Sequence, residues 1–297
     1  MRRNESNSVA NAVTAPASGP APRRIKPSLL VLSGLATLLV MMPFLFWHGV
    51  WFGRRLSNQD IERYLQDRDH PRKIQHALSQ IADRMQRGGA GVSQWYSQVV
   101  SLAGHPAAQV RMTAAWVMGH DHNSEAFHQA LLRLLKDPEV MVRRNAALSL
   151  VRFGDASGRT ELVNTLRPYT LRTPEQGRVE IQAQPGEEVT AGTLLALVRR
   201  DQGGEVQVRA PFSGRVEGNA IKDGSTVAAG DELVQISPEP GQVWEALRGL
   251  YFVGQPEDLP EVERYSRGVA NMPDSTRQQA LSTIRAIRTR SERDATR

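Results

Sequence analysis

The longest apolar segment of the chain lies near its N-terminus. Residues 28–52 read SLLVLSGLATLLVMMPFLFWHGVWF and contain no Asp, Glu, Lys or Arg. A helix of this length measures about 37 Å, enough to cross the ~30 Å hydrocarbon core of a bilayer. Trp47 and Trp51 lie at its far end, and aromatic side chains favour the membrane–water interface. The pattern predicts one transmembrane helix over residues 28–52.

Amphipathic helical segments follow, and two of them share one pattern at an offset of 32 residues. The first, from Leu102, reads LAGHPAAQVRMTAAWVMG, and the second, from Leu134, reads LLKDPEVMVRRNAALSLVRFG. In each, His-Pro or Asp-Pro precedes Val-Arg and a pair of alanines. The Pro-containing turn ends one helix and starts the next, and the alanines let helices approach closely. Such pairs bury their apolar faces by stacking, which predicts a helical repeat array over 57–168.

The C-terminal part continues the helical pattern. From Ala246 the chain reads ALRGLYFVGQPEDLPEVERY, typical of the second helix of one repeat, a turn and the next first helix. From Thr276, TRQQALSTIRAI resembles VRRNAALSLVRF, which starts at Val142. We predict that the array resumes over 241–290 and ends in a disordered tail, 291–297. Aromatic residues at helical spacing are assigned to the core: Trp95, Tyr96, Trp116, Trp244, Tyr251 and Phe252.

Between the two helical parts, residues 173–238 are rich in Gly and Val and lose the helical period. This segment repeats internally. One half, from Gly177, reads GRVEIQAQPGEEVTAGTLLALV, and the other, from Gly214, reads GRVEGNAIKDGSTVAAGDELVQI. Equivalent glycines recur at an offset of 37 or 38 residues. Short strands separated by Gly turns predict a small β sandwich or barrel of two intertwined halves.

Both patterns resemble known families. The order Asp-Pro, Val-Arg, Ala-Ala resembles HEAT and HEAT-like repeats, which implies contacts within the array for Arg111 and Arg143. The β segment resembles the biotinyl/lipoyl domain and its relative, the barrel-sandwich hybrid of membrane-fusion proteins, the adaptors of efflux pumps and type I secretion systems. The matching motifs are Ala210-Pro211-x-x-Gly214-x-Val216 and Gly224-x-x-Val227-x-x-Gly230-x-x-Leu233. The expected fold class is α+β multidomain, with one transmembrane helix, an α-solenoid (HEAT-like) and a small all-β barrel-sandwich hybrid.

The biotinyl/lipoyl resemblance does not carry over the carrier chemistry. Carrier domains of that family place a modified Lys on the hairpin between the halves. Here the hairpin reads Arg200-Asp201-Gln202-Gly203-Gly204-Glu205 and has no Lys, while Lys222 lies in another turn. An acyl or carboxyl carrier needs an amine at that tip, so we expect no cofactor. The hairpin is also too short for the coiled-coil arm that many membrane-fusion proteins possess.

Motifs for catalysis or metal binding are missing from the sequence. The chain has no Cys, which excludes disulfides, thiolate nucleophiles and Cys-ligated zinc. A phosphate-binding loop, a G-x-S-x-G elbow and an H-E-x-x-H motif do not occur. His120-Asp121-His122, with His128 nearby, reads as a turn between repeats rather than three converging metal ligands. We expect no catalytic, cofactor-binding or metal-ligating residue and a protein that is not an enzyme.

The net charge of +6 comes from the two ends of the chain. Residues 1–27 hold five basic residues and one acidic residue, and residues 277–297 hold six and two, which leaves −2 for the middle. Because no basic, aromatic-interleaved surface appears in the body, we expect no nucleic-acid partner. The first 27 residues are rich in Ala, Pro, Ser and Asn, which predicts a disordered basic leader.

Basic residues flank the predicted transmembrane helix on both sides, so the charges alone leave its orientation open. The basic leader resists export, which favours a soluble body in the periplasm, anchored to a bacterial inner membrane. From the resemblance we expect a non-enzymatic, membrane-anchored scaffold or adaptor that binds proteins in an envelope transport or secretion assembly. The alternatives are an inner-face scaffold for cytoplasmic regulatory or enzyme complexes and, less favoured, a carrier or enzyme subunit. The candidate docking turns contain Asp201, Gln202, Gly203, Gly204, Glu205, Gly186 and Gly224.

Overall fold

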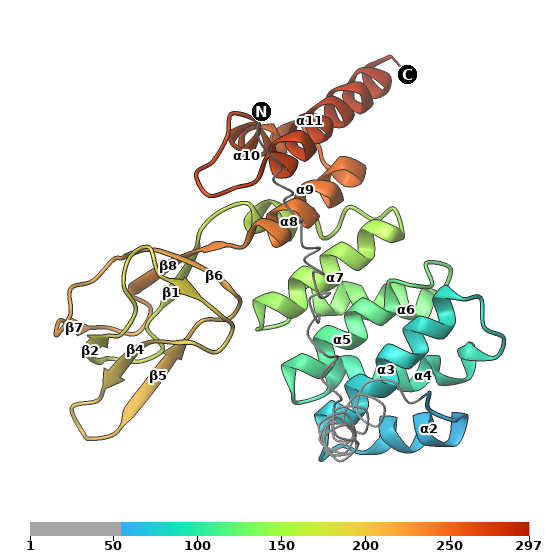
Figure 1. Ribbon diagram of the computed structural model, residues 1–297, viewed down its shortest axis with the longest axis horizontal. Coiled ribbons are helices and arrows are strands. Elements are labelled where there is room, and N and C mark those ends of the chain that lie inside the picture. Colours follow the sequence, from blue (N-terminus) through green and yellow to red (C-terminus); the bar gives the residue numbers. More distant parts are fainter. Residues whose placement is uncertain (1–54, 297) are drawn as a thin grey trace, which may run out of the picture. The chain divides into compact units, whose positions relative to one another are not determined.

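The computed structural model describes residues 55–296. The predicted leader (1–27) and transmembrane helix (28–52) lie outside the described residues. Among residues 55–296, no helix is both long and apolar enough to cross a bilayer. This part of the chain is an α+β multidomain structure in which helices precede and follow a β module (Figure 1).

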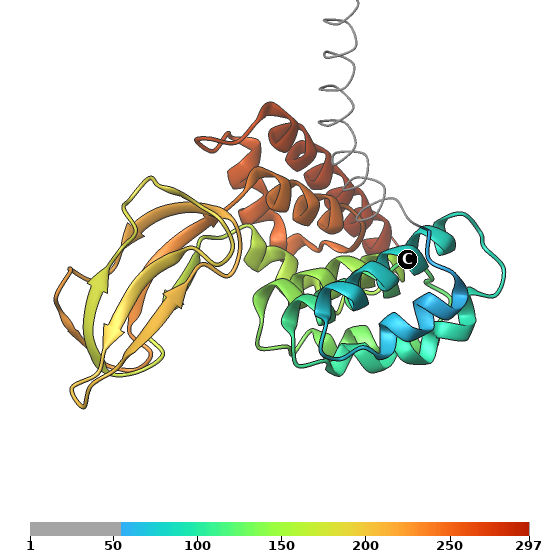
Figure 2. The same ribbon diagram turned by 60° about the horizontal axis from the view of Figure 1, so that its bottom comes forward.

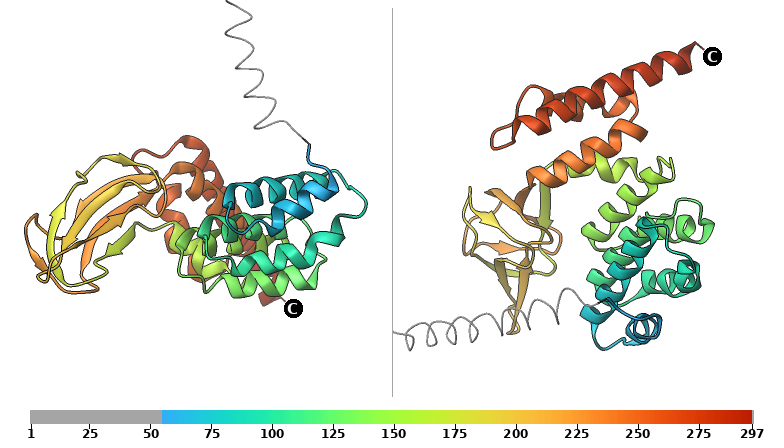
Figure 3. Two further views of the ribbon diagram at one scale, coloured as in Figure 1. Left: turned by 90° about the horizontal axis from the view of Figure 1, so that it is seen from below. Right: turned by 45° about the vertical axis from the view of Figure 1, so that its right-hand side comes forward.

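The helices form stacked antiparallel pairs, α2/α3, α4/α5, α6/α7, α8/α9 and α10/α11. The second helices of the pairs also contact one another in the order α3, α5, α7, α9, α11, and α9 and α11 run side by side in Figure 3. This arrangement confirms the predicted repeat array. The helical elements are α2 (Asn58–Gln66), α3 (Pro71–Gln86), η1 (Val92–Trp95), α4 (Tyr96–Ser101), η2 (Leu102–Gly104), α5 (Ala108–Met118), α6 (Glu125–Leu134), α7 (Val140–Arg152), α8 (Arg159–Thr165), α9 (Pro240–Val253), η3 (Pro256–Asp258), α10 (Leu259–Ser266) and α11 (Asp274–Ala295).

The repeated Arg joins neighbouring repeats. Arg111 donates to both carboxylate oxygens of Asp137, at 2.7 and 2.8 Å, and to the carbonyl of His105 at 2.9 Å. Arg143 makes the equivalent contacts to Glu161, at 3.2 Å, and to the Asp137 carbonyl, at 2.8 Å. Each Arg therefore holds the Pro-containing turn of its own repeat and an acidic residue of the next, as the HEAT resemblance implies.

Buried hydroxyl groups make a second repeated contact. Ser149 on α7 donates to the Ala115 carbonyl of α5 at 2.8 Å. Thr283 on α11 donates to the Leu247 carbonyl of α9, also at 2.8 Å. Because the two bonds lie on opposite sides of the β module in sequence, one repeat geometry continues across the insertion.

The β module consists of two antiparallel four-stranded sheets, with strand orders β1-β8-β6-β3 and β5-β4-β2-β7 (Figure 2). Each sheet combines strands of both sequence halves, so the halves are intertwined. Buried apolar side chains between the sheets form the core, among them Val179, Leu195, Phe212, Val216 and Leu233. The strands are β1 (Tyr169–Arg172), β2 (Gly177–Ile181), β3 (Glu188–Val189), β4 (Leu194–Arg199), β5 (Glu205–Arg209), β6 (Gly214–Asn219), β7 (Thr226–Val227) and β8 (Glu232–Pro238).

The two halves exchange equivalent hydrogen bonds. The Val179 carbonyl accepts from the N–H of Gly224 at 2.9 Å, and the Val216 carbonyl accepts from the N–H of Gly186 at 2.7 Å. The acceptors are 37 residues apart and the donors 38, which is the offset of the sequence repeat. The repeated Val and Gly positions therefore mark where each half binds the other.

The β module interrupts a single repeat, because α8 lies before it and α9 after it, and these two helices pair with each other. The chain enters the module on β1 and leaves on β8, which are neighbouring strands with Tyr169 opposite Ile236. The insertion therefore starts and ends at almost the same place, which lets α8 and α9 stay together.

Two sequence-based expectations are wrong in the helical part. Trp116, Tyr251 and Phe252 were expected in the core, but 38%, 40% and 57% of their surfaces are exposed. Helical spacing alone does not distinguish the buried side of a solenoid helix from its solvent side. The predicted disordered tail, 291–297, is also wrong, because α11 stays helical to Ala295. Arg290 anchors it by donating to the carbonyls of Tyr251 and Phe252, and the segment is rich in residues that favour helix.

Candidate protein-interaction site

The hairpin between β4 and β5, the main docking candidate from the sequence, lies at the end of the module away from the helices (Figures 1 and 2). The Arg200 N–H donates to the Gly204 carbonyl at 3.0 Å, which closes the turn. Gly203 and Gly204 have φ angles of 89° and 85°, a region that glycine adopts without strain. The Arg200 side chain pairs with Glu175, and this hydrogen bond lowers the pKa of the Glu175 carboxyl. The tip is thus a tight, charged turn.

The other two docking candidates lie elsewhere on the module. Gly186 precedes β3, at the edge of one sheet, and Gly224 precedes β7, at the edge of the other. Their N–H groups bind the opposite half of the module, as described above. The structure therefore does not bring the three turns together into one surface, and docking at any of them stays a prediction.

The histidine cluster of the sequence does not converge either. His120 Nε2 lies 2.7 Å from Gln86, whereas Asp121 accepts a hydrogen bond from the Tyr96 hydroxyl at 2.6 Å. His128 Nε2 lies 2.6 Å from a third partner, Asp155. Across residues 55–296, no group of three or more His, Asp or Glu side chains is placed to hold a metal ion.

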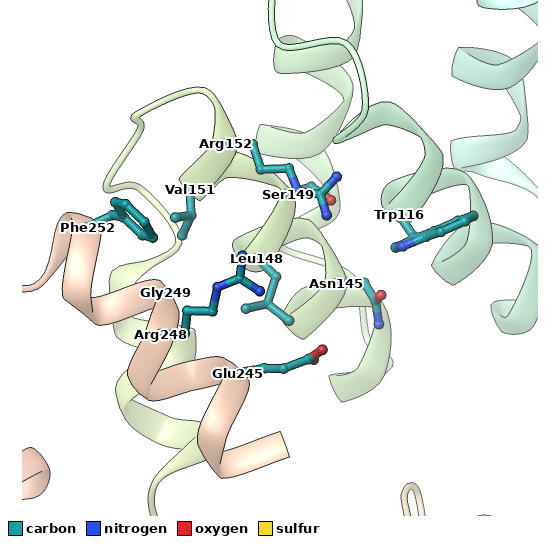
Figure 4. A pocket seen from close by; sticks show the side chains of 10 residues that line it. All are labelled: Trp116, Asn145, Leu148, Ser149, Val151, Arg152, Glu245, Arg248, Gly249 and Phe252. Atoms are coloured by element: carbon teal, nitrogen blue, oxygen red, sulfur yellow. The ribbon is translucent and has the colours of Figure 1, made fainter. Parts of the chain in front are cut away.

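A pocket missed by the sequence analysis opens between α5, α7 and α9 (Figure 4). Its volume is about 260 Å³. Trp116 forms one wall from α5, Leu148 and Arg152 project from α7, and Arg248 and Phe252 project from α9. Two aromatic side chains and two arginines thus lie close together on the exposed sides of the second helices. We call the exposed surface of α5, α7, α9 and α11 the second-helix face.

Gly249 of α9 lines this pocket and differs from the equivalent residues of the neighbouring repeats. When the repeats are aligned, Gly249 of α9 corresponds to Ser149 of α7 and to Thr283 of α11. Ser149 and Thr283 each bind the preceding second helix through a hydroxyl, which Gly249 does not have. A Cβ at Gly249 would lie 2.9 Å from Leu162 Cδ1, so glycine permits the close approach of α9 to α8.

A second, more open pocket of about 660 Å³ lies between the ends of α9 and α11. Tyr251 and Phe252 contribute its aromatic wall, and Arg285, Arg290 and Arg293 line its other side. Phe252 also lines the first pocket, so the two hollows are neighbours on one continuous face.

The second-helix face carries excess positive charge. Five arginines line the two pockets, against one acidic residue, Glu245: Arg152, Arg248, Arg285, Arg290 and Arg293. Within the described part of the chain, none of these five forms an ion pair. Arginines beside the first helices and turns do, for example Arg167 with Glu261 and Arg288 with Glu263, both at 2.8 Å. From the sequence, we expected no basic surface with interleaved aromatic side chains in the body. That expectation is wrong, because the stacking of the helices gathers these residues from distant parts of the chain.

The β module is fixed to the array beside α7. Arg144, only 4% exposed, donates to Gln242 of α9 at 2.7 Å, and Gln242 donates to the Ser213 carbonyl of the module at 3.1 Å. Burial lowers the pKa of Arg144 to about 10, so the guanidinium stays charged at neutral pH. Val140 of α7 belongs to the apolar core of the module. The module and the array are therefore packed together.

Comparisons with known proteins agree with both motifs. Residues 97–183 match the family model of HEAT repeats, and residues 170–236 match the model described as biotin-requiring enzyme. One similar solved structure is titled "Structure and function of a single-chain, multi-domain long-chain acyl-coa carboxylase". It shares 18% identity over 34% of this chain and only 11% of that chain, with a TM-score of 0.23. No curated protein matches the sequence. The chain thus combines a HEAT-repeat region with a biotinyl/lipoyl-like domain, and HEAT arrays offer extended surfaces for protein binding.

Proposed function

We propose that this protein is a non-enzymatic scaffold that binds protein partners through the second-helix face. The observation that carries the proposal is the exposure of Trp116, Tyr251 and Phe252 beside a pocket and beside arginines that form no ion pair within residues 55–296. Aromatic residues and Arg supply most of the energy at protein interfaces, especially around a recess that accepts a partner side chain. The hairpin of the module, without an amine, favours binding over acyl or carboxyl transfer.

The scaffold acts at a membrane, to which residues 28–52 anchor it as a transmembrane helix. The apolar length of this segment and the flanking basic residues support the anchor. The resemblance of the module to membrane-fusion proteins supports an adaptor role in an envelope transport or secretion assembly, with the body in the periplasm. Reporter fusions after Arg297 test this placement: activity of an export-dependent reporter supports it, and activity of only a cytoplasmic reporter favours the inner-face scaffold.

Site-specific photo-crosslinking in intact cells tests the scaffold itself. A photoreactive phenylalanine replaces Trp116 or Phe252 on the second-helix face, and the matched control replaces Arg133, an exposed residue of the first helix α6. We expect crosslinks to a protein partner from the two face positions and none from position 133. Failure of both face positions to capture any protein would refute the proposed function.

A further inference from the structure

The second-helix face is about as long as a helix of 18 residues. Four neighbouring helices, α5, α7, α9 and α11, contribute to it. Packed helices lie about 8–10 Å apart, so the face extends over roughly 27 Å. A helix of about 18 residues has the same length. An elongated segment could therefore contact both pockets at once.

The positive charge of the second-helix face favours an acidic occupant. The five arginines have no carboxylate partner among residues 55–296, while Glu245 is the one acidic residue in the lining. Arg donates in a planar fork that matches a carboxylate, and these hydrogen bonds are stronger than neutral ones. An occupant with several Asp or Glu residues would supply the partners that the chain itself does not.

The apolar positions define the second requirement. Trp116 and Leu148 flank the first pocket, and Phe252 separates it from the second. Arg248 projects between them (Figure 4). Both pockets thus combine apolar side chains with arginines. A helix with apolar residues three and four positions apart, and acidic residues between these, matches such a surface.

Segments of this chain fit the face poorly. The N-terminal leader holds five basic residues against one acidic residue, so the face would repel it. The β module of a second copy is acidic, but its carboxylates lie on strands and turns rather than along one side of a helix, and Glu175, Glu180 and Glu232 already pair with arginines of the module. The complementary ligand is a separate protein.

We propose that the second-helix face binds an acidic amphipathic helix of a partner protein. Apolar side chains of that helix occupy the pocket between α5, α7 and α9, and its carboxylates bind Arg248, Arg285 and Arg293. This inference rests on the proposed function for the choice of a protein as ligand, and it adds the chemistry of the segment that is recognised.

Fluorescence anisotropy with the full chain in detergent micelles tests the inference. The probe is a labelled amphipathic peptide of about 18 residues with Leu on one face and Glu on the other; a second peptide carries Lys in place of Glu. We expect only the Glu peptide to bind. The double variant Arg248→Glu, Arg285→Glu should weaken it about 10- to 100-fold, whereas Arg133→Glu, the matched control, should leave its affinity unchanged.

Several results would overturn the inference: no binding of the Glu peptide, equal binding of both peptides, or no effect of the double variant. Binding of phosphatidylglycerol vesicles that is lost in the double variant, without binding of the peptide, would identify a lipid surface and also overturn it. The crosslinking experiment separates the two proposals. A protein captured at position 116 or 252, together with no affinity for the Glu peptide, refutes the acidic helix and leaves the scaffold function intact.

Discussion

The guanidinium carbon of Arg144 lies 4.1 Å from the centre of the Phe212 ring. Arg144 belongs to α7 and Phe212 to the β module, so this cation–π contact joins the two folds of the chain. Gln242 of α9 accepts the hydrogen bond from the same guanidinium. An aromatic face and an amide oxygen thus take the place of water around a buried charge.

Replacement of Arg144 should distinguish its charge from its packing. We expect Arg144→Ala to lower the free energy of unfolding by about 2–4 kcal/mol, because it opens a cavity and leaves Gln242 without its donor. Arg144→Met retains most of the volume and removes a desolvated charge, so it should cost less than half as much. Urea denaturation of both variants measures the difference. Equal losses would show that the charge, rather than the filled volume, holds the junction.

The ion pair between Arg111 and Asp137 should contribute to acid sensitivity. Burial disfavours the Asp137 carboxylate, but the hydrogen bonds from Arg111 and from the Glu139 N–H prevail and lower its pKa below the ordinary 3.8. The folded state therefore holds this proton less tightly than the unfolded chain. The stabilisation is complete above the unfolded pKa and is lost as pH falls through the lowered folded pKa.

Asp137→Asn should therefore reduce stability by roughly 2–4 kcal/mol at pH 7, because it breaks a largely buried pair. It should also give a shallower decline of stability between about pH 5 and pH 2 than the unmodified chain shows. Thermal unfolding measured across this pH range gives both quantities. Parallel curves for the two proteins would mean that Asp137 does not carry the acid sensitivity.

Removal of the β module should leave a folded helical array. Since β1 and β8 are neighbouring strands, a short Gly-Ser linker in place of residues 170–237 should join α8 to α9 without moving them. We expect cooperative unfolding with a lower urea midpoint, because Val140 and Met141 lose their apolar partners in the module. Circular dichroism during urea titration measures this. A non-cooperative transition would show that the array depends on the module for its fold.

The module should carry no biotinyl or lipoyl group in cells. Its hairpin offers no amine, and Lys222, which is exposed, lies in the turn before β7. Intact-mass spectrometry of the chain purified from its native source should therefore give the unmodified mass. Lys222→Arg is the control: an added mass that disappears in this variant would establish carrier chemistry at an unexpected turn.

Sequence motifs predicted the parts of this fold in which equivalent residues of two repeats make the same contact. Arg111 and Arg143 were visible because two successive repeats use the same Arg to hold their own turn to the next repeat. Gly186 and Gly224 were visible because the two halves of the module exchange equivalent hydrogen bonds. In both cases equivalent residues recur at a fixed spacing because the structural unit that contains them is repeated.

Features that depend on relationships between helices could not be predicted. Trp116 and Phe252 have the spacing of core residues, and only the stacking of α5, α7 and α9 places them in solvent. The pocket forms where α5, α7 and α9 meet, and the sequence of each helix alone does not show that these three are neighbours. The split repeat was hidden because α8 is short, with seven residues between Arg159 and Thr165.

The attachment of the module to both helices of one pair has a mechanical consequence. A domain on one flexible linker can swing without disturbing its neighbour, whereas this module is continuous with α8 through β1 and with α9 through β8. A rotation of the module relative to the array would therefore have to displace α8 or α9, and α9 carries Arg248 and Phe252 of the first pocket.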